Sequence, residues 1–163
     1  MFKVLLAYYA CLRIVLRSQL TFNPIRFHLI YPGPGMIKCL HHVAIIGSDK
    51  AASLRFYRDI LGLPVIAEDY QEARGSWKID LSVPDGPQLE LFIFNDAPER
   101  LSYPEARGLR HLAFAVDDLD KVLVKLAEGG VVAEPVRIDP YTRAKFTFVQ
   151  DPDGLPVELY QCG

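Results

Sequence analysis

The sequence of 163 residues has little of several features that mark particular protein classes. No uncharged apolar run approaches the ~20 residues of a membrane-spanning helix, which argues against a membrane protein. Lysine and arginine total 18 against 20 acidic residues, a net charge of −2, so the basic excess typical of a nucleic-acid-binding protein is missing. With 11 glycines and 12 prolines, the chain is not of low complexity. Its 50% hydrophobic residues are enough for a folded core.

Cysteine is also scarce, with only Cys11, Cys39 and Cys162 and no C-x-x-C pair. An odd, widely spaced set is not a disulfide framework and indicates a reducing compartment, so we expect a cytoplasmic protein. Cys39 lies close to His41 and His42 in the sequence. A zinc-finger site would need a second ligand pair at a short spacing, and we therefore expect Cys39 to be a packed thiol.

Acidic residues are absent from the first 35 positions, which carry four basic ones. The remaining residues, 36–163, carry the other 14 basic side chains and all 20 acidic ones, so a +4 leader precedes a −6 body. The apolar run Val4–Leu12 is compatible with a secretory signal, a transit peptide or an interfacial helix. We favour an over-extended gene start with Met36 as the initiator, because structured sequence begins directly after it. Residues 1–35 are then outside the folded domain.

The body contains an internal repeat at an offset of 68 to 69 residues, in which His42–Asp49 matches His111–Asp118. Self-similarity of this kind indicates two copies of one structural unit. We place module 1 at 38–97 and module 2 at 108–161. The linker between them contains prolines and a glycine that interrupt regular structure.

Each module is predicted to have the element order βαβββ, which makes the fold α+β. A helix follows each matched strand; its N-cap is Ser48 or Asp49 in module 1 and Asp117 or Asp118 in module 2. Three further strands per module are predicted from short runs of strand-forming residues. These runs are Val65–Tyr70, Ser76–Val83 and Gln88–Phe94 in module 1, and Val131–Arg137, Lys145–Gln150 and Pro156–Gln161 in module 2.

Each module also places a histidine on its first strand and a glutamate on its last, His42 with Glu90 and His111 with Glu158. Side chains alternate along a strand, so these residues head otherwise apolar faces, where a polar group without a partner is costly. A lone strand histidine is usually structural, but here both residue types recur at both equivalent positions. If the two sheets curl toward each other, two imidazoles and two carboxylates converge. That donor set suits nickel, zinc, cobalt or manganese and leaves positions for water on an octahedral ion.

Residues 38–161 resemble the vicinal oxygen chelate superfamily (the glyoxalase, bleomycin resistance and dioxygenase proteins), and within it glyoxalase I. The resemblance rests on the motifs His42-Val-Ala-Ile, Arg55-Phe-Tyr-Arg-Asp-Ile-Leu-Gly62, Glu90-Leu-Phe, Gly108-Leu-Arg-His-Leu-Ala-Phe114 and Asp151-Pro-Asp-Gly-Leu-Pro-Val-Glu158. It implies tandem βαβββ modules that form a U-shaped mixed sheet around one divalent metal ion. The implied ligands are His42, Glu90, His111 and Glu158.

The resemblance also implies a lyase or isomerase of the lactoylglutathione lyase type. In glyoxalase I the metal holds both oxygens of a hemithioacetal, made from methylglyoxal and a thiol, and a base moves a proton between carbons through an enediolate. By similarity, Glu158 is that base. This chain has Ile46 and Phe94 where the family often has an arginine and an asparagine that grip glutathione. The two departures argue against a glutathione pocket.

Two polar runs, Tyr70–Lys78 and Arg137–Lys145, are rich in arginine, lysine and aromatic residues. They suit either a solvated hairpin surface or the binding of a small anionic substrate. The candidate substrate-binding residues are Arg74, Trp77, Lys78, Arg137, Tyr141 and Lys145.

Other functions of the same fold compete with a glyoxalase. A ring-cleaving dioxygenase or an antibiotic-modifying thiol transferase is disfavoured, because the fourth ligand, Glu90, leaves fewer open positions on the metal. An epimerase acting on an acyl thioester and a non-catalytic binding or resistance protein both stay open. Superfamily relatives often dimerise, so we expect a homodimer acting on a small molecule. Its metal site lies within one chain or is shared between two.

Overall fold

The computed structural model describes residues 37–104 and 106–162. The predicted leader, residues 1–35, lies outside the described residues, so its origin stays a prediction. Residues His42–Gly163 make one compact unit. No helix in the described ranges has the length and apolarity needed to cross a membrane.

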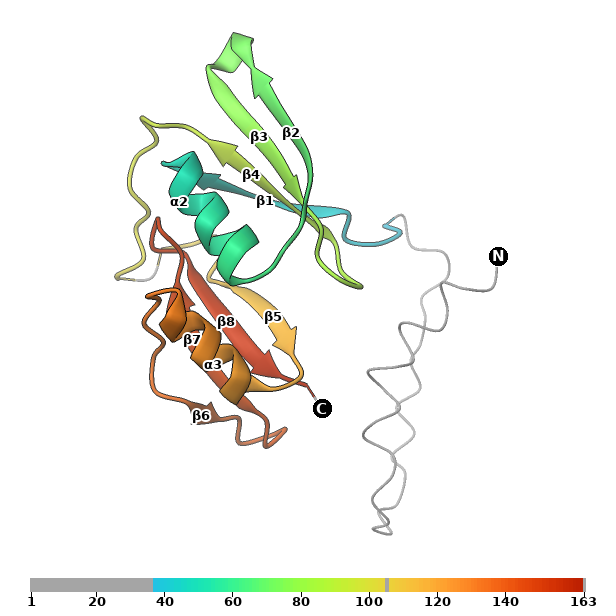
Figure 1. The fold of residues 1–163 in the computed structure, drawn as a ribbon, viewed down its shortest axis with the longest axis vertical. Coiled ribbons are helices and arrows are strands. Elements are labelled where there is room, and N and C mark those ends of the chain that lie inside the picture. The colour runs from blue at the N-terminus through green and yellow to red at the C-terminus, as the bar shows by residue number, and fades with distance from the viewer. Residues whose placement is uncertain (1–36, 105, 163) are drawn as a thin grey trace. The chain divides into compact units, whose positions relative to one another are not determined.

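The first half of this unit is a four-stranded mixed sheet with one long helical segment (Figure 1). The strands are ordered β1-β4-β3-β2; β1 runs parallel to β4, and the other neighbours are antiparallel. In chain order the elements are strand β1 (His42–Gly47), helix α2 (Lys50–Leu54), π-helix η2 (Arg55–Ile60), strand β2 (Val65–Gln71), the 3-10 turn η3 (Glu72–Arg74), strand β3 (Ser76–Leu81) and strand β4 (Gln88–Ile93).

The second half repeats this arrangement, with strand order β5-β8-β7-β6 and β5 parallel to β8. Its elements are β5 (Leu112–Val116), α3 (Leu119–Glu128), β6 (Arg137–Ile138), β7 (Lys145–Gln150) and β8 (Pro156–Gln161). Both halves therefore follow the βαβββ order, and the predicted α+β fold with two tandem modules is confirmed.

One predicted strand is wrong over most of its length. The run Val131–Arg137 becomes a strand only at its end, where β6 covers Arg137–Ile138. Pro135 interrupts the run and has no N–H to donate to a ladder. The segment instead meets β7 at Glu134, whose N–H donates to the Phe148 carbonyl at 2.8 Å and whose carbonyl accepts from Thr147 Oγ1 at 2.7 Å.

The first helix begins at one of its two predicted caps. Asp49 has extended backbone angles, and its Oδ1 accepts a hydrogen bond from the Ala52 N–H at 2.7 Å. This side-chain bond satisfies one of the N–H groups that a helix start leaves without a partner. After Leu54 the helix continues in the wider π form of η2, which the spacing of apolar residues does not indicate.

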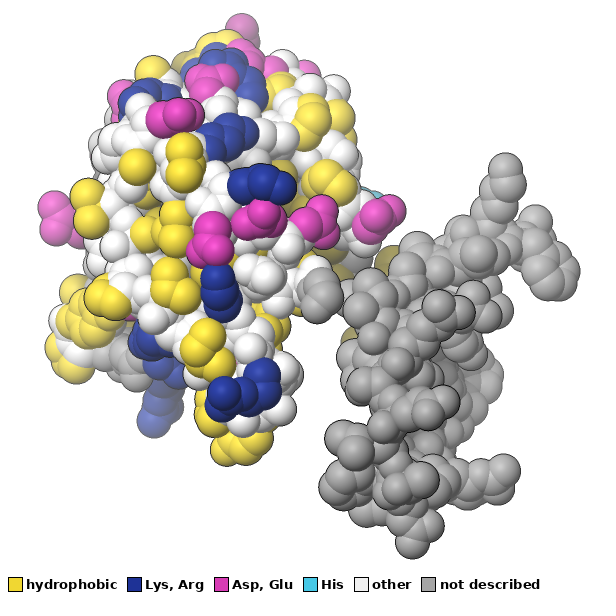
Figure 2. Space-filling model, turned by 60° about the horizontal axis from the view of Figure 1, so that its bottom comes forward, with side chains coloured by type: hydrophobic (Ala, Val, Ile, Leu, Met, Phe, Trp, Pro, Cys, Tyr) yellow, Lys and Arg dark blue, Asp and Glu magenta, His cyan; other side chains and the backbone are white. Residues whose placement is uncertain are grey.

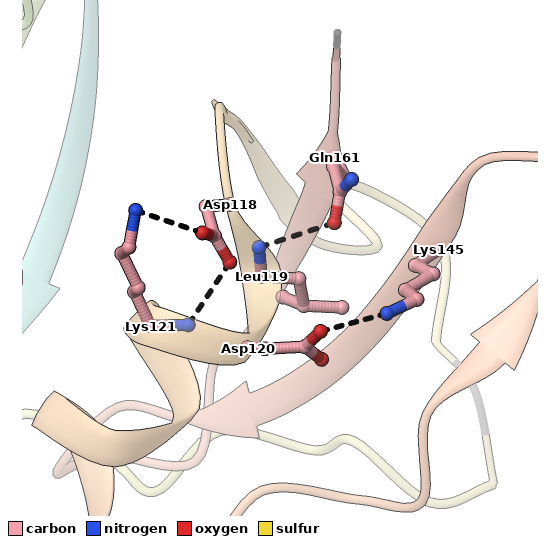
Figure 3. A network of polar contacts seen from close by, with 6 residues as sticks. All are labelled: Asp118, Leu119, Asp120, Lys121, Lys145 and Gln161. Carbon is pink, nitrogen blue, oxygen red and sulfur yellow. Dashed lines mark hydrogen bonds and ion pairs between the residues drawn. The ribbon is translucent and has the colours of Figure 1, made fainter.

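The second helix is anchored at its start to the neighbouring sheet (Figure 3). Asp118 is the cap, and its Oδ1 accepts from the Lys121 N–H at 3.1 Å. The Leu119 N–H donates to Gln161 Oε1 on β8 at 3.2 Å. The side chain of a strand residue therefore satisfies another N–H of the helix start and fixes α3 against β8.

The buried side chains of both modules form a single hydrophobic core. Alternate residues of each sheet point into it; Leu89 and Leu91 on β4 and Val157 and Leu159 on β8 are at most 2% exposed. Because side chains alternate along a strand, the residues between them point to the opposite sheet faces. The outer faces, defined here as the sheet faces turned away from this core, carry the predicted metal ligands.

Polar contacts also join the two modules, at the turn before β8. Tyr57 Oη donates to Asp151 Oδ2 at 2.7 Å, and both residues are buried. The Ser48 N–H donates to Asp153 Oδ2 at 3.1 Å. Two carboxylates of one turn in module 2 thus bind the helix region of module 1, which fixes the modules relative to each other.

Charged side chains of both signs are interspersed with hydrophobic ones on the face of the molecule that Figure 2 shows. A nucleic-acid-binding face would instead carry a continuous basic stripe. The view agrees with the near balance of charge in the sequence.

Candidate functional site

The strand register places the histidine and glutamate of each module in the same relative position. In the parallel pair β1–β4, Glu90 lies opposite Ala44, two residues beyond His42. In β5–β8, Glu158 lies opposite Ala113, two residues beyond His111. Residues two apart on a strand share a face, so each histidine and its glutamate lie diagonally across adjacent strands on one outer face.

The side chains of each pair approach each other closely. The distance from His42 Nε2 to Glu90 Oε2 is 3.8 Å, and that from His111 Nε2 to Glu158 Oε2 is 3.2 Å. The two glutamate side chains are only 12% and 15% exposed, whereas the histidine side chains are 43% and 28% exposed. Each module therefore presents an imidazole nitrogen and a carboxylate oxygen together at a partly open surface.

The two pairs do not meet within one chain. Among residues 37–104 and 106–162, no group of three or more histidine, cysteine, aspartate or glutamate side chains is close enough to hold a metal ion. The reason is the shared core: both sheets turn their helix-covered faces toward it, so both pairs lie on outer faces. Each pair, His42–Glu90 and His111–Glu158, is half of the predicted ligand set and is termed a half-site.

Each half-site fits two ligands of one divalent ion. With metal–ligand bonds of about 2.1 Å, neighbouring ligands stand about 3.0 Å apart at a right angle and about 3.4 Å apart at the tetrahedral angle. The 3.2 Å of the second half-site falls in this range, and the 3.8 Å of the first needs a small side-chain adjustment. Nitrogen and carboxylate donors also match the preference of zinc, nickel, cobalt and manganese.

An unsatisfied atom marks the second half-site. His111 Nδ1 is buried without a hydrogen-bond partner among the described residues. Buried polar atoms are almost always paired, and the other exception among the described residues is Ser76 Oγ, at the start of β3. This observation fits a ring whose surroundings are completed by something other than the described chain.

The two half-sites differ in what surrounds their glutamates. Lys78 Nζ lies 3.3 Å from Glu90 Oε1 and also bonds Asp80, and the bond to Asp80 raises the pKa of the Lys78 ammonium. By strand register, the positions equivalent to Lys78 and Asp80 in module 2 are Phe146 and Phe148. A cation holds Glu90, whereas Glu158 lies beside an aromatic wall.

A cavity of about 410 Å³ opens beside the second half-site. His111 and Phe148 line it, and their rings meet edge to face with centroids 5.3 Å apart. The cavity is also lined by four arginines, Arg100, Arg107, Arg110 and Arg137. Only Arg137 is among the predicted substrate-binding residues. The density of arginine in the linker was the available sequence signal for the other three.

Of the six predicted substrate-binding residues, the structure brings Lys78 to the first half-site and Arg137 to the cavity. The other four lie elsewhere. Arg74 is in the turn η3, and the Trp77 ring lies 3.3 Å from Lys50 Nζ, measured to the ring centroid. Tyr141 is 94% exposed, and Lys145 forms an ion pair of 2.8 Å with Asp120 (Figure 3). The packed-thiol prediction is wrong, because Cys39 is exposed.

Comparison with known proteins gives a consistent result. The family model described as Glyoxalase/Bleomycin resistance protein/Dioxygenase superfamily matches residues 39–159. The uncharacterized protein YaeR of Escherichia coli is 54% identical over 125 residues, which cover 77% of this chain and 97% of that protein. A probable lactoylglutathione lyase of Synechocystis is 32% identical over 129 residues, covering 75% of this chain and 94% of that protein. The crystal structure of a glyoxalase family protein from Enterococcus faecalis is 46% identical and aligns with a TM-score of 0.70, over 76% of this chain and 97% of that one.

Proposed function

Because the chain belongs to the glyoxalase/bleomycin resistance protein/dioxygenase superfamily, we propose that it is a metal-dependent lyase or isomerase of the glyoxalase type. Its substrate is a small dicarbonyl compound or the hemithioacetal of one, and its location is the cytoplasm. The relative named as a probable lactoylglutathione lyase supports this reaction class. The observation that carries the proposal is the repeated diagonal pair of histidine and glutamate on equivalent strands of the two modules.

The complete metal centre in this proposal is assembled from two copies of the chain. Each half-site supplies two ligands and lies on its own outer face. The four predicted ligands meet when His42 and Glu90 of one protomer face His111 and Glu158 of its partner. The outer faces carry apolar side chains suited to being covered, for example Ile46 on β1, which is 57% exposed. Burial of such groups between two copies is favourable. The proposed assembly is a homodimer with two equivalent sites.

A divalent ion bound by these ligands would act as a Lewis acid and stabilise the negative charge that develops on the substrate oxygens. The two histidines would hold the ion through their ring nitrogens. Lys78 bonds one oxygen of Glu90 and leaves the other, Oε2, on the side of His42. Glu90 is therefore held in one orientation and acts as a fixed ligand.

Glu158 is the proposed general base. Among the described residues, the charged group beside its carboxylate is His111, whose Nε2 lies 3.2 Å from Oε2. On β7 it lies opposite Phe148, and the guanidinium carbon of Arg137 is 5.1 Å from the ring centroids of Phe146 and Phe148. Lys78 fixes the orientation of Glu90, whereas the close charged partner of Glu158 is His111, so Glu158 is the proposed carboxylate that turns to accept a proton from the substrate.

Metal analysis and turnover test the proposal together. We expect the purified full chain to bind about one divalent ion per protomer, and to convert methylglyoxal in the presence of a thiol with nickel, zinc, cobalt or manganese. Glu158→Gln should lower kcat by about 100-fold or more while the metal remains bound. Absence of stoichiometric metal after reconstitution would refute the metal centre. Full occupancy without turnover would favour a binding protein instead.

Mixing two inactive variants tests whether the site is shared. His42→Ala breaks one half-site and His111→Ala breaks the other, so neither homodimer has a complete centre. Random exchange of protomers leaves one complete centre in each mixed dimer, and about a quarter of the wild-type activity should return. A mixture of His42→Ala with Glu90→Gln, which damage the same half-site, is the matched control and should stay inactive. Equal recovery in both mixtures, or none in either, would refute the shared site.

A further inference from the structure

The cavity beside His111 is strongly positive although the body of the protein is acidic. Among the described residues that line it, four are arginines and one, Glu134, is acidic, which leaves a net charge of +3. Residues 36–163 as a whole carry 14 basic and 20 acidic side chains. A local excess of positive charge in a protein that is otherwise negative attracts anions into the cavity.

Arg137 is fixed in the wall of this cavity. Its guanidinium carbon lies 5.1 Å from the ring centroids of both Phe146 and Phe148. Its Nη2 lies 2.9 Å from Glu134 Oε2. Cation–π contacts with two rings and one ion pair hold the guanidinium group, so a ligand that binds it costs less further side-chain entropy.

The linker arginines complete the wall. Arg100 Nη2 donates to the carbonyls of Leu109 and Arg110, which ties the two ends of the linker together. Because carbonyls are uncharged, these bonds do not neutralise the charge of the Arg100 guanidinium. No carboxylate of the described residues, which leave out position 105, pairs with Arg107. Guanidinium groups without carboxylate partners are suited to bind carboxylate or phosphate oxygens in pairs.

We infer that this cavity binds an anionic group of the substrate, a carboxylate or a phosphate, through Arg107 and Arg137. The inference rests on the proposed function, because His111 lines the same cavity and would place the reacting end of the substrate at the metal centre. It narrows the substrate class to anionic carbonyl compounds or anionic thiol adducts. Glu134 competes with the ligand for Arg137 and so limits affinity.

Anion binding is measured on the full chain after removal of metal with EDTA, so that the result does not depend on the metal centre. Inorganic phosphate and malonate serve as separate probes, titrated at low ionic strength and followed by nuclear magnetic resonance of the arginine side-chain N–H groups. Arg107→Met and Arg137→Met should each weaken binding of at least one probe by about tenfold, since each removes a charge-assisted hydrogen bond. Arg58→Met is the matched control, because Arg58 is exposed and paired with Asp59.

Glu134→Gln tests the inference in the opposite direction. It removes the carboxylate that competes for Arg137, and binding of the preferred probe should become severalfold tighter. Arg137→Lys keeps the charge but loses the planar fork, so it should weaken binding less than Arg137→Met. If phosphate binds more tightly than malonate the ligand group is a phosphate, and the reverse order indicates a carboxylate.

The outcomes separate this inference from the proposed function. Equal affinities in Arg58→Met, Arg107→Met and Arg137→Met, or no saturable shift with either probe, would overturn the anion site even if the metal centre is intact. Specific anion binding in a chain that holds no metal after reconstitution would support the site and overturn the proposed reaction instead. Thermal unfolding of each variant establishes that the compared proteins are folded.

Discussion

The hydrogen bond between Tyr57 and Asp151 predicts a large and measurable contribution to stability. It joins η2 of module 1 to the turn before β8 in module 2, at 2.7 Å between Tyr57 Oη and Asp151 Oδ2. Tyr57 is 1% and Asp151 is 7% exposed. Replacing Tyr57 with phenylalanine keeps the ring in the core and its edge-to-face contact with Phe56. The substitution removes only the hydroxyl.

The size of the expected loss of stability depends on which hydrogen bonds the Asp151 carboxylate keeps in the Tyr57→Phe variant. Asp151 Oδ1 still accepts from the N–H groups of Asp153 at 2.9 Å and Leu155 at 2.8 Å, but Oδ2 loses the hydrogen bond from Tyr57. A hydrogen bond to a charged group is worth about 1.5–3 kcal/mol, and a buried acceptor left unpaired adds to the loss. Tyr57→Phe should therefore lower the free energy of unfolding by about 2–3 kcal/mol.

Urea unfolding at fixed protein concentration measures the difference. The midpoint should fall while the slope m stays the same, because the surface exposed on unfolding is unchanged. Fixed concentration matters, since dimerisation would itself change apparent stability. A loss of less than about 0.5 kcal/mol, the range of a neutral surface substitution, would refute the account of this bond.

The pH dependence of the same comparison provides a second check. Burial, reinforced by the charge of Asp151, raises the pKa of Tyr57 above its ordinary value of 10.0. The bond therefore stabilises fully below that ordinary pKa, and the stabilisation is lost as pH rises above it, because the unfolded chain then ionises more readily. The stability difference between wild type and Tyr57→Phe should shrink above about pH 10. A difference that is constant from neutral pH to pH 11 would contradict the assignment.

Three further substitutions test the packing and the caps by thermal unfolding. Gly129→Ala should cost about 1–3 kcal/mol, because its Cβ would lie 2.9 Å from Cδ1 of Ile60, and adding Ile60→Val, which removes that carbon, should recover part of the loss. Asp118→Ala should cost about 1 kcal/mol by removing the cap of α3, whereas Asp117→Ala should have less than half that effect. Leu81→Ala, at a position with 0% exposure, should cost about 2–5 kcal/mol, and a smaller loss would mean that the core collapses around the gap.

Much of the fold could be predicted from the sequence because the two modules repeat the same pattern. The strands at Lys145–Gln150 and Pro156–Gln161 and the caps Asp49 and Asp118 agree with the structure. Local features decide these elements, namely alternation of apolar residues and a side-chain acceptor at each helix start. The strand expected at Val131–Arg137 failed where Pro135 outweighed the β-branched residues around it.

The sequence could predict that each histidine lies near the glutamate of its own module, but not how the two pairs are placed; that they are metal ligands stays a prediction. The repeat singled out the two histidines and two glutamates, and strand register brings each histidine near its own glutamate. The sequence could not show which sheet face turns to the core, since that depends on how the modules pack. It also could not show that Lys78 would contact Glu90 while Phe146 occupies the equivalent position in module 2.

The duplication itself explains why the half-sites are separate. Both modules cover the same sheet face with their helix, and both contribute that face to one core. Any residue placed on the uncovered face of one module therefore has its equivalent on the uncovered face of the other, on the far side of the core. Two equivalent ligand pairs in such a chain can complete a four-ligand centre only with a second chain. Association and metal binding should consequently be linked, and metal should strengthen the dimer by as much as dimerisation strengthens metal binding.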